Sequence, residues 1–220
     1  MTNFIYDIKQ EYIDSFCNIE DDVLKDLYRE THLTQLHPRM ISGPTQAAFI
    51  AMLVKISNAK NVLEIGTYTG YTSICIARAL PENGKLTSIE INDEIEWLIR
   101  KYFKLADIEN KVNLLIGDAL EILPKIEEVF DLVFIDADKR EYINYYEIVL
   151  SKTKPGGLIL VDNVLWDNKI FYPVESNDYM TKGIMEFNDF VRNDNRVEKV
   201  ILDIRDGFMI LRKNGRVNRR

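Results

Sequence analysis

The chain of 220 residues has little of what marks secreted, membrane-spanning or zinc-binding proteins. Its two cysteines, Cys17 and Cys75, favour buried, reduced thiols over a disulfide framework. No segment approaches the roughly 20 apolar residues of a membrane span, and acidic residues interrupt the N-terminal segment where a secretory signal needs an apolar run. The two histidines, His32 and His37, form no zinc pattern, and surface or packing roles are expected for them. These absences indicate a cytoplasmic protein.

Positive charge is also in deficit. The chain has 28 basic and 35 acidic residues, a net charge of −7, whereas proteins that bind nucleic acid broadly present a basic surface. Hydrophobic residues make up 46% of the chain and charged residues 29%, without internal repeats or low-complexity segments. A domain of this length buries about 70% of its unfolded surface, which is enough for a sheet with helices on both faces.

The rest of the chain is organised around residues 61–77. An apolar run ends at Glu64, glycines follow at Gly66 and Gly70, and apolar residues then recur at helical spacing. This pattern predicts a buried strand, a tight turn where a ligand can approach the backbone, and a helix. The Gly-x-Gly-x-x-Gly of pyrophosphate sites and the Lys-Ser/Thr of phosphate loops are both missing. The turn therefore favours an adenosine ligand without phosphates.

Helices are expected before this unit. Residues 1–39 read as a helical arm that packs either on its own domain or on a second subunit, because apolar residues recur at three-to-four spacing: Ile5, Ile8, Tyr12, Phe16, Val23, Leu24, Leu27 and Tyr28. Ser42 is the expected cap of the next helix, and Pro44 lies in its first turn. The predicted inner face of that helix consists of Phe49, Met52, Leu53 and Ile56.

Strands and helices alternate downstream. Strands are predicted at 85–90, 112–116, 132–136 and 158–161, with helices at 93–105, after Ala119, from about Arg140 and at about 183–191. Two final apolar runs, 197–204 and 208–211, predict a hairpin at the sheet edge. The predicted fold class is α/β: a doubly wound, Rossmann-like, seven-stranded and mostly parallel sheet with a C-terminal antiparallel hairpin and helices on both faces.

Ligands of open α/β sheets bind beyond the carboxyl ends of the strands, so the polar residues there are candidates. Glu90 ends the second strand, where an acid can accept hydrogen bonds from both ribose hydroxyls; the alternative is an exposed acid that caps the next helix. Asp118 accepts from an adenine amino group or simply caps the helix from Ala119. Glu64 contacts the amino end of the ligand, contacts the N–H groups of its own loop, or is purely structural.

Three oxygen-bearing side chains at neighbouring strand ends suggest a metal. Asp136, Asp162 and Asn163 form an incomplete, all-oxygen ligand set of the kind that suits Mg²⁺. The alternative is ordinary turn chemistry for Asp-Asn after a strand. We favour the metal because Asp136 closes the neighbouring apolar strand.

Lys139 follows Asp136 by three residues, at the start of the next helix. A cation beside a metal ion has its pKa lowered by repulsion and desolvation, so Lys139 is the candidate general base. The alternative is a solvated lysine that pairs with Asp138 or Glu141.

Taken together, these motifs resemble the cation-dependent O-methyltransferases, the catechol and caffeoyl-CoA methyltransferase family with its bacterial relatives. The similarity extends from about residue 40 to 213 and rests on an ordered set of motifs: residues 62–73, Gly117-Asp118-Ala119, residues 134–146, Pro155-Gly156-Gly157, residues 162–166 and Asp206-Gly207.

The resemblance implies that S-adenosylmethionine lies over the glycine loop. The matching cofactor positions are Ser42, Glu64, Gly66, Tyr71, Thr72, Glu90, Asp118, Ala119 and Asp136. It also implies that Asp136, Asp162 and Asn163 bind Mg²⁺ or another divalent cation such as Mn²⁺ or Ca²⁺, that Lys139 deprotonates the acceptor, and that Met40 lies near the transferred methyl group. Two vicinal oxygens of the acceptor would chelate the ion.

The expected acceptor is a small aromatic diol, and the expected enzyme is a homodimer. The loop 167–180, where relatives recognise their acceptors, matches no particular one. The alternatives are a methyltransferase for hydroxylated wobble uridine in tRNA and a non-catalytic protein that binds the adenosyl ligand, while a dinucleotide dehydrogenase is disfavoured.

The stretch 212–220 carries five cations, which either touch phosphate or are merely solvated. The predicted division is an arm at 1–39, a methyltransferase domain at 40–213 and a basic tail at 214–220.

Overall fold

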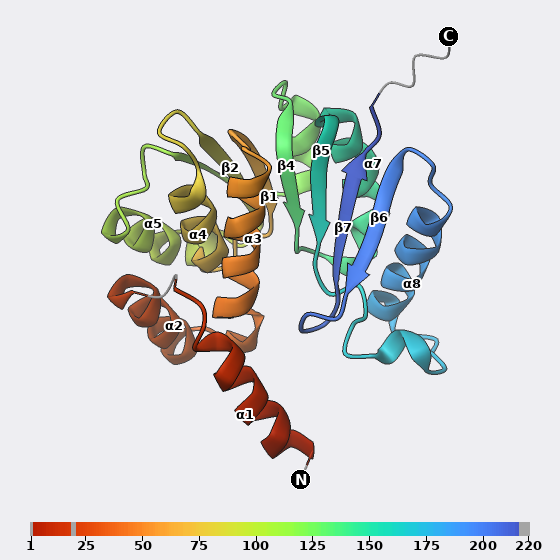
Figure 1. Cartoon of the computed structure of the whole chain (residues 1–220), viewed down its shortest axis with the longest axis horizontal. Helices are drawn as coiled ribbons and strands as arrows, with labels where there is room; N and C mark the ends of the chain where they lie inside the picture. The colour runs from red at the N-terminus through yellow and green to blue at the C-terminus, as the bar shows by residue number, and fades with distance from the viewer. Residues whose placement is uncertain (1, 19–20, 216–220) are drawn as a thin grey trace.

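The computed structural model describes residues 2–18 and 21–215, with side chains from residue 8 onward (Figure 1). The basic tail from residue 216, and the side chain of Ile5, lie outside these described residues. None of the helices within the described ranges has the length and apolarity that a membrane span needs.

A mixed sheet forms the centre of the molecule. Within the described residues it has seven strands in the order β3-β2-β1-β4-β5-β7-β6. The strands are β1 (Asn61–Ile65), β2 (Lys85–Glu90), β3 (Val112–Ile116), β4 (Phe130–Ile135), β5 (Thr153–Val161), β6 (Val197–Leu202) and β7 (Phe208–Lys213). The first five run parallel, while β7 pairs antiparallel with both β5 and β6. The predicted fold class is confirmed.

Helices cover both faces of the sheet (Figure 1). They are α1 (Thr2–Asp14), α2 (Asp22–Thr34), α3 (Pro44–Ile56), α4 (Tyr71–Ala79), α5 (Glu96–Leu105), α6 (Ala119–Ile122), α7 (Tyr142–Lys152) and α8 (Tyr179–Arg192), with short 3₁₀ turns η1 (Pro38–Met40), η2 (Asp93–Ile95), η3 (Leu123–Lys125), η4 (Lys139–Glu141) and η5 (Lys169–Phe171). Side chains alternate across each strand, so Leu63 packs with α7 and α8, and its neighbour Val62 packs with α3 and α4.

The strand register brings the predicted polar ends to one edge. Ile65 is level with Ile89 on β2 and with Ile135 on β4, and Ile135 is level with Val161 on β5. Backbone hydrogen bonds continue one residue further, since Asp136 N donates to Ile65 O over 2.9 Å and Asp162 N donates to Ile135 O over 3.0 Å. The residues that follow these strands therefore stand side by side.

Two local expectations about α3 need correction. Its buried face contains Ala47, Ile50, Ala51 and Val54. Of the four predicted residues, Phe49 and Leu53 are partly buried and pack against the core, whereas Met52 and Ile56 are 58% and 69% exposed. The helix is apolar on nearly every side, so periodicity does not select a face, and the small alanines lie where α3 meets α4. Its N-cap is Gly43 without a side-chain cap; Ser42 instead accepts a hydrogen bond from Thr72 Oγ1 over 2.8 Å. Pro44 occupies the first turn as expected.

The N-terminal helices differ in how they pack. Leu24 and Leu27 of α2 are buried among side chains of α4 and α5. On α1, which contacts α3, Tyr12 is 67% exposed and Ile8 is exposed as well; Phe16, just after the helix, is 68% exposed. The apolar stripe of α2 therefore belongs to the core, whereas that of α1 faces outward.

Strand β5 begins earlier than expected. It starts at Thr153 rather than at residue 158 and includes the Pro155-Gly156-Gly157 segment, because Thr153 already pairs with Phe130 across an irregular register. The apolar run visible in the sequence is only the second half of this strand.

Candidate active site

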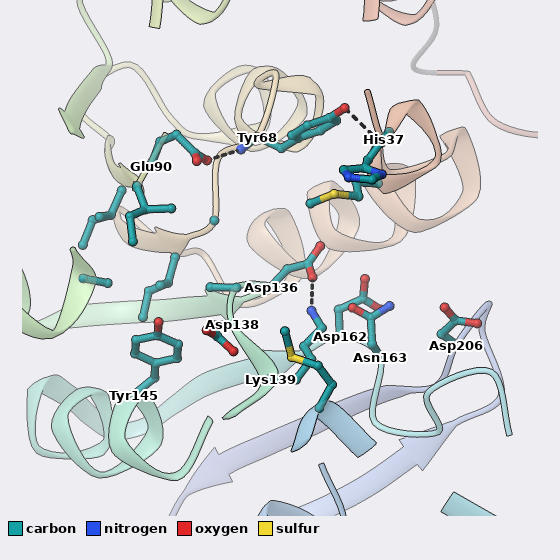
Figure 2. A pocket seen from close by; sticks show the side chains of 18 of the residues that line it. His37, Tyr68, Glu90, Asp136, Asp138, Lys139, Tyr145, Asp162, Asn163 and Asp206 are labelled. Atoms are coloured by element: carbon teal, nitrogen blue, oxygen red, sulfur yellow. Dashed lines mark hydrogen bonds and ion pairs between the residues drawn. The ribbon is translucent and has the colours of Figure 1, made fainter. Parts of the chain in front are cut away.

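A cavity of about 810 Å³ opens at the carboxyl edge of the strands (Figure 2). Its wall includes the predicted residues Gly66, Glu90, Ala119, Asp136, Lys139, Asp162 and Asn163. The segment from Leu36 to Met40 forms another part of the wall and connects the N-terminal helices to the site. The cavity therefore joins four of the nine predicted cofactor positions to all of the predicted metal and base positions.

Gly66 lets the turn after β1 lie against the end of β4. Its φ is +97°, and a Cβ at this position would stand 1.9 Å from the carbonyl oxygen of Asp136. No rotation of a side chain can relieve such a contact, because both partners are backbone. The glycine is thus required for the close approach that brings the two halves of the site together.

Glu90 is a buried acid at the end of β2. Its Oε2 accepts from the backbone N–H of Tyr68 over 2.6 Å, and its Oε1 accepts from that of Asn92 over 2.9 Å (Figure 2). Burial raises the pKa of the carboxyl group, and these N–H donors partly offset the effect. The alternative of an exposed helix-capping acid does not fit, because Glu90 is buried in the cavity wall and Asn92 caps the following turn.

Glu64 lies behind the cavity rather than in its wall. Its Oε2 accepts hydrogen bonds from the hydroxyls of Ser73 and Ser88, and its Oε1 has no hydrogen-bond partner. Burial raises the pKa of this carboxyl group to about 7. These contacts are with serine hydroxyls of α4 and β2, and the contact of Glu64 with the amino end of the cofactor stays a prediction.

Three further cofactor positions surround a small crevice beside the cavity. Ser42, Tyr71 and Thr72 line this crevice, which shares Gly66 and Asp136 with the main cavity. Thr72 and Ser42 are both buried and bonded to each other.

Asp118 stands apart from the other candidates. It is exposed, it does not line the cavity, and its Oδ1 accepts from Leu120 N over 2.8 Å as the cap of α6. This is the capping role that competed with adenine binding. Ala119 does line the cavity.

Lys139 is a buried cation in contact with Asp136. Its Nζ donates to Asp136 Oδ1 over 2.7 Å (Figure 2). The same Nζ lies 5.1 Å from the ring centre of Tyr142. Burial lowers the pKa of Lys139, but the Asp136 carboxylate raises it more, so the net pKa lies above the ordinary value. The expected lowering of the Lys139 pKa depends on a metal ion beside it and stays a prediction. The alternative was a solvated lysine that pairs with Asp138 or Glu141. Among the described residues, Asp138 is bonded to Arg140 and not to Lys139.

Asp162 and Asn163 follow β5 and complete the oxygen set. Asp162 is buried, and its Oδ1 lacks a hydrogen-bond partner. Burial and the nearby Asp136 carboxylate raise the pKa of Asp162 to about 7. Among the described residues, no three His, Cys, Asp or Glu side chains gather closely enough to hold a metal ion. A divalent cation here thus needs the Asn163 amide oxygen as its third ligand, and a donor set with an unsatisfied carboxylate oxygen fits such an ion.

Several contributing residues escaped the sequence prediction. Arg205, in the turn between β6 and β7, donates to Gln46 Oε1 over 3.0 Å, and the buried Gln46 amide helps to lower the pKa of Asp162. Tyr68 donates its hydroxyl to His37 O over 3.0 Å and so ties the glycine loop to the N-terminal part of the wall. Tyr68 could have been predicted from its position inside the glycine motif. Gln46 and Arg205 are 159 residues apart, and no sequence pattern links them.

The family model described as O-methyltransferase matches residues 14–214. The chain belongs to the O-methyltransferase family. The catechol O-methyltransferase of Niastella koreensis is 34% identical, over 93% of this chain and 93% of its own length. A caffeoyl-CoA O-methyltransferase of Populus trichocarpa is 35% identical, over 88% of this chain and 83% of its own.

Solved structures agree with this assignment. The O-methyltransferase from Bacillus cereus in complex with SAH has a TM-score of 0.86 and 30% identity, covering 93% of this chain and 96% of its own. The predicted resemblance and enzyme class, an O-methyltransferase, are confirmed. The family match begins inside α1, so the O-methyltransferase region also takes in α2 of the predicted arm.

Proposed function

We propose that the chain transfers a methyl group from S-adenosylmethionine to one hydroxyl of a small catechol-like phenolic, with a divalent cation such as Mg²⁺, Mn²⁺ or Ca²⁺. Relatives named for catechol and caffeoyl-CoA support the acceptor class, and the SAH complex of the Bacillus cereus relative supports the donor. Residues 40–213 would form the catalytic domain and the preceding helices an arm.

The observation that carries the proposal is the buried Asp162 carboxyl beside Asp136. The Asp136 carboxylate lies close enough to disfavour ionisation of Asp162, and Asp162 Oδ1 has no hydrogen-bond partner. An unpaired buried carboxylate is costly, so the arrangement calls for a cation that both acids and Asn163 share. When bound, a divalent cation supplies charge that favours the ionised form of a neighbouring hydroxyl.

The side chains of the cavity have separable tasks in this proposal. Glu90 accepts from the ribose hydroxyls with the lone pairs that Tyr68 and Asn92 leave open, and Gly66 leaves room for the donor. Lys139 Nζ, once it has lost its own proton to solvent, takes the proton of the acceptor hydroxyl. The ionised oxygen then attacks the methyl carbon, the methyl–sulfur bond breaks, and S-adenosylhomocysteine leaves with the electron pair of that bond. Trp166 forms part of the wall near Lys139, at 5.7 Å from Nζ to the ring centre, and excludes water from that side.

The test supplies labelled S-adenosylmethionine with catechol and, as a matched control, with resorcinol, whose hydroxyls are not vicinal. We expect label in catechol only, loss of transfer in EDTA, and recovery with Mg²⁺. Asp162→Asn should abolish the response to Mg²⁺, while an exposed substitution such as Asp189→Asn should leave it intact. Full transfer to catechol in the presence of EDTA would contradict the metal role.

Unmodified tRNA is the acceptor in the alternative proposal. Two of the cations that suggested it have partners within the fold: Arg212 pairs with Glu198, and Lys213 Nζ donates to Leu150 O and Thr153 O over 2.7 Å each. We therefore rank tRNA second. Label that enters total tRNA lacking the modification, and none of the phenolics, would reverse this order.

A homodimer is the proposed assembly. Its support is an exposed apolar stripe formed by Ile8 and Tyr12 of α1 and by Phe16 just after that helix. A second copy that covers these side chains would remove them from water. Light scattering should give twice the chain mass for the wild-type protein and the single mass for a Tyr12→Asp, Phe16→Asp variant, with Val129→Asp as an exposed control. A monomeric wild-type protein would disprove the proposal.

A further inference from the structure

Asn188 is a buried polar residue with no part in the cavity wall. It lies in α8 between Phe187, which is buried, and the exposed Asp189. Its Nδ2 donates to Val164 O over 2.7 Å, and its Oδ1 has no hydrogen-bond partner. Asparagine is a poor helix former, and a buried unsatisfied oxygen is unfavourable, so this residue costs stability on the side of its Oδ1.

The carbonyl that Asn188 binds belongs to an unusual loop. Asn163, Trp166, Asp167 and Asn168 all have positive φ, at 60°, 47°, 52° and 60°. Asn and Asp tolerate this conformation better than most residues, but a bulky side chain such as that of Trp166 adopts it only where surrounding contacts impose it. The loop carries Asn163 at one end and Trp166 in its middle, and both line the cavity.

The opposite side of the loop is held by the hairpin between β6 and β7. Val164 N donates to Gly207 O over 3.1 Å, and Leu165 N donates to Asp206 O over 2.8 Å. A Cβ on Gly207 would stand 2.7 Å from Leu165 N, so only glycine permits this approach. Val164 is thus held on two sides: its N–H donates to the hairpin, and its carbonyl accepts from Asn188 of α8.

We propose that Asn188 is a positioning residue: through Val164 O it fixes the loop that presents Asn163 and Trp166 to the cavity. The inference rests on the proposed function, in which Asn163 is a metal ligand. Without the Nδ2 donor, the carbonyl of Val164 loses its anchor on the helix side, and the strained residues beside it can relax away from the cavity.

The experiment compares Asn188→Ala with Asn193→Ala, a matched control on the same helix. Asn193 also donates its Nδ2 to a backbone carbonyl, that of Asp189 over 3.0 Å, but it is exposed at the C-terminal end of α8. Binding of SAH shows that a variant is folded. Mn²⁺ affinity is measured by calorimetry on the SAH complex, and Trp166 is read by fluorescence in a Trp97→Phe background, where it is the single tryptophan.

For Asn188→Ala we expect Mn²⁺ affinity to fall by about ten-fold or more, as for other residues that orient a metal ligand, with SAH affinity changed by less than about two-fold. Trp166 emission should shift to the red and become easier to quench with acrylamide. Asn193→Ala should behave as the wild type. Wild-type Mn²⁺ affinity together with unchanged Trp166 emission in Asn188→Ala would overturn the inference.

Two outcomes separate this inference from the proposed function. If Asp162→Asn leaves Mn²⁺ affinity unchanged, the metal site itself is wrong, and the Trp166 signal alone then decides whether Asn188 holds the loop. If Asn188→Ala does not bind SAH, Asn188→Ser is tested in the same way, because a serine hydroxyl restores a short donor. Loss of SAH binding in both variants would also overturn the inference, since Asn188 would then support the whole fold and not the loop.

Discussion

Lys139 Nζ lies 2.7 Å from Asp136 Oδ1, so the proposed base and a proposed metal ligand are in direct contact. The ion pair keeps Lys139 protonated, because the carboxylate raises its pKa above the ordinary value even though burial opposes this. A second positive charge shared by the carboxylate would weaken that hold on the proton. Proton loss from Lys139 and cation binding at Asp136 are in this way coupled.

Replacement of Lys139 tests its role as a base. For Lys139→Ala we expect kcat to fall by about 10² to 10⁴, the usual contribution of a positioned acid or base, while the Kd for SAH changes little. Lys104→Ala, on the exposed side of α5, is the control. An unchanged kcat would remove Lys139 from the mechanism.

Gly66→Ala tests the close approach of the β1 turn to β4. The new methyl group would meet the Asp136 carbonyl and would also need an unfavourable positive φ, so we expect unfolding free energy to fall by about 2 to 5 kcal/mol. Gly215→Ala, which meets nothing within 4 Å, should have almost no effect. Urea denaturation measures both. A Gly66→Ala protein as stable as the wild type would mean that the turn can move away from β4.

Glu64 gives the stability of the protein a defined pH dependence. Its pKa is raised from 4.5 to about 7, because burial disfavours the charged form. The folded state therefore binds the proton more tightly than the unfolded state does, and stability falls as pH rises through this window, by at most about 1.4 kcal/mol per pH unit. Asp162, also raised, acts in the same direction when divalent ions are removed.

The measurement for Glu64 is urea denaturation in EDTA at a series of pH values. Glu64→Gln cannot ionise, so the decline between about pH 4.5 and 7 should be shallower in this variant than in the wild type. Parallel pH profiles for the two proteins would show that Glu64 is already ionised in the folded state.

Asp194 is expected to stabilise the end of α8. Its Oδ2 accepts from the buried Tyr146 hydroxyl over 2.8 Å, and Arg196 donates to both of its oxygens. Burial raises the pKa of Asp194, but these donors outweigh it and lower the pKa to about 2. Asp194→Asn should reduce stability at neutral pH by about 1 to 3 kcal/mol.

Asp189→Asn is the matched control for Asp194, since the pair that Asp189 forms with Arg192 is exposed on the same helix. Such pairs contribute about 0 to 1 kcal/mol. The difference between the two variants should vanish as pH falls toward 2, where the Asp194 carboxylate takes up its proton. Equal effects of the two substitutions at neutral pH would contradict the role given to Asp194.

The sheet and the edge that carries the site could be predicted from the sequence, because parallel strands bring the polar residues at their carboxyl ends to one edge. Glu90, Asp136 and Asp162 each follow a buried apolar run, and the register brings the three together without further information. The same logic gave Lys139, whose position depends only on the turn after Asp136.

Other features depend on contacts between distant segments. Glu64 accepts hydrogen bonds from Ser73 of α4 and Ser88 of β2, and no pattern around Glu64 in the sequence predicts either contact. Gln46 acquires its role from Arg205, at the other end of the domain. The predicted buried face of α3 was wrong at Met52 and Ile56 for a related reason. The orientation of an almost wholly apolar helix is set by the elements it packs against and not by its own sequence pattern.

Strand β7 is made from residues 208–213 yet lies between β5 and β6. The sheet is therefore complete only when residues 208–213 have inserted between two strands that precede them in the sequence. During synthesis, the hairpin that binds Leu165 cannot form until residues 197–213 have emerged. The loop that carries Asn163 and Trp166 therefore gains its hairpin contacts only once β7 is in place.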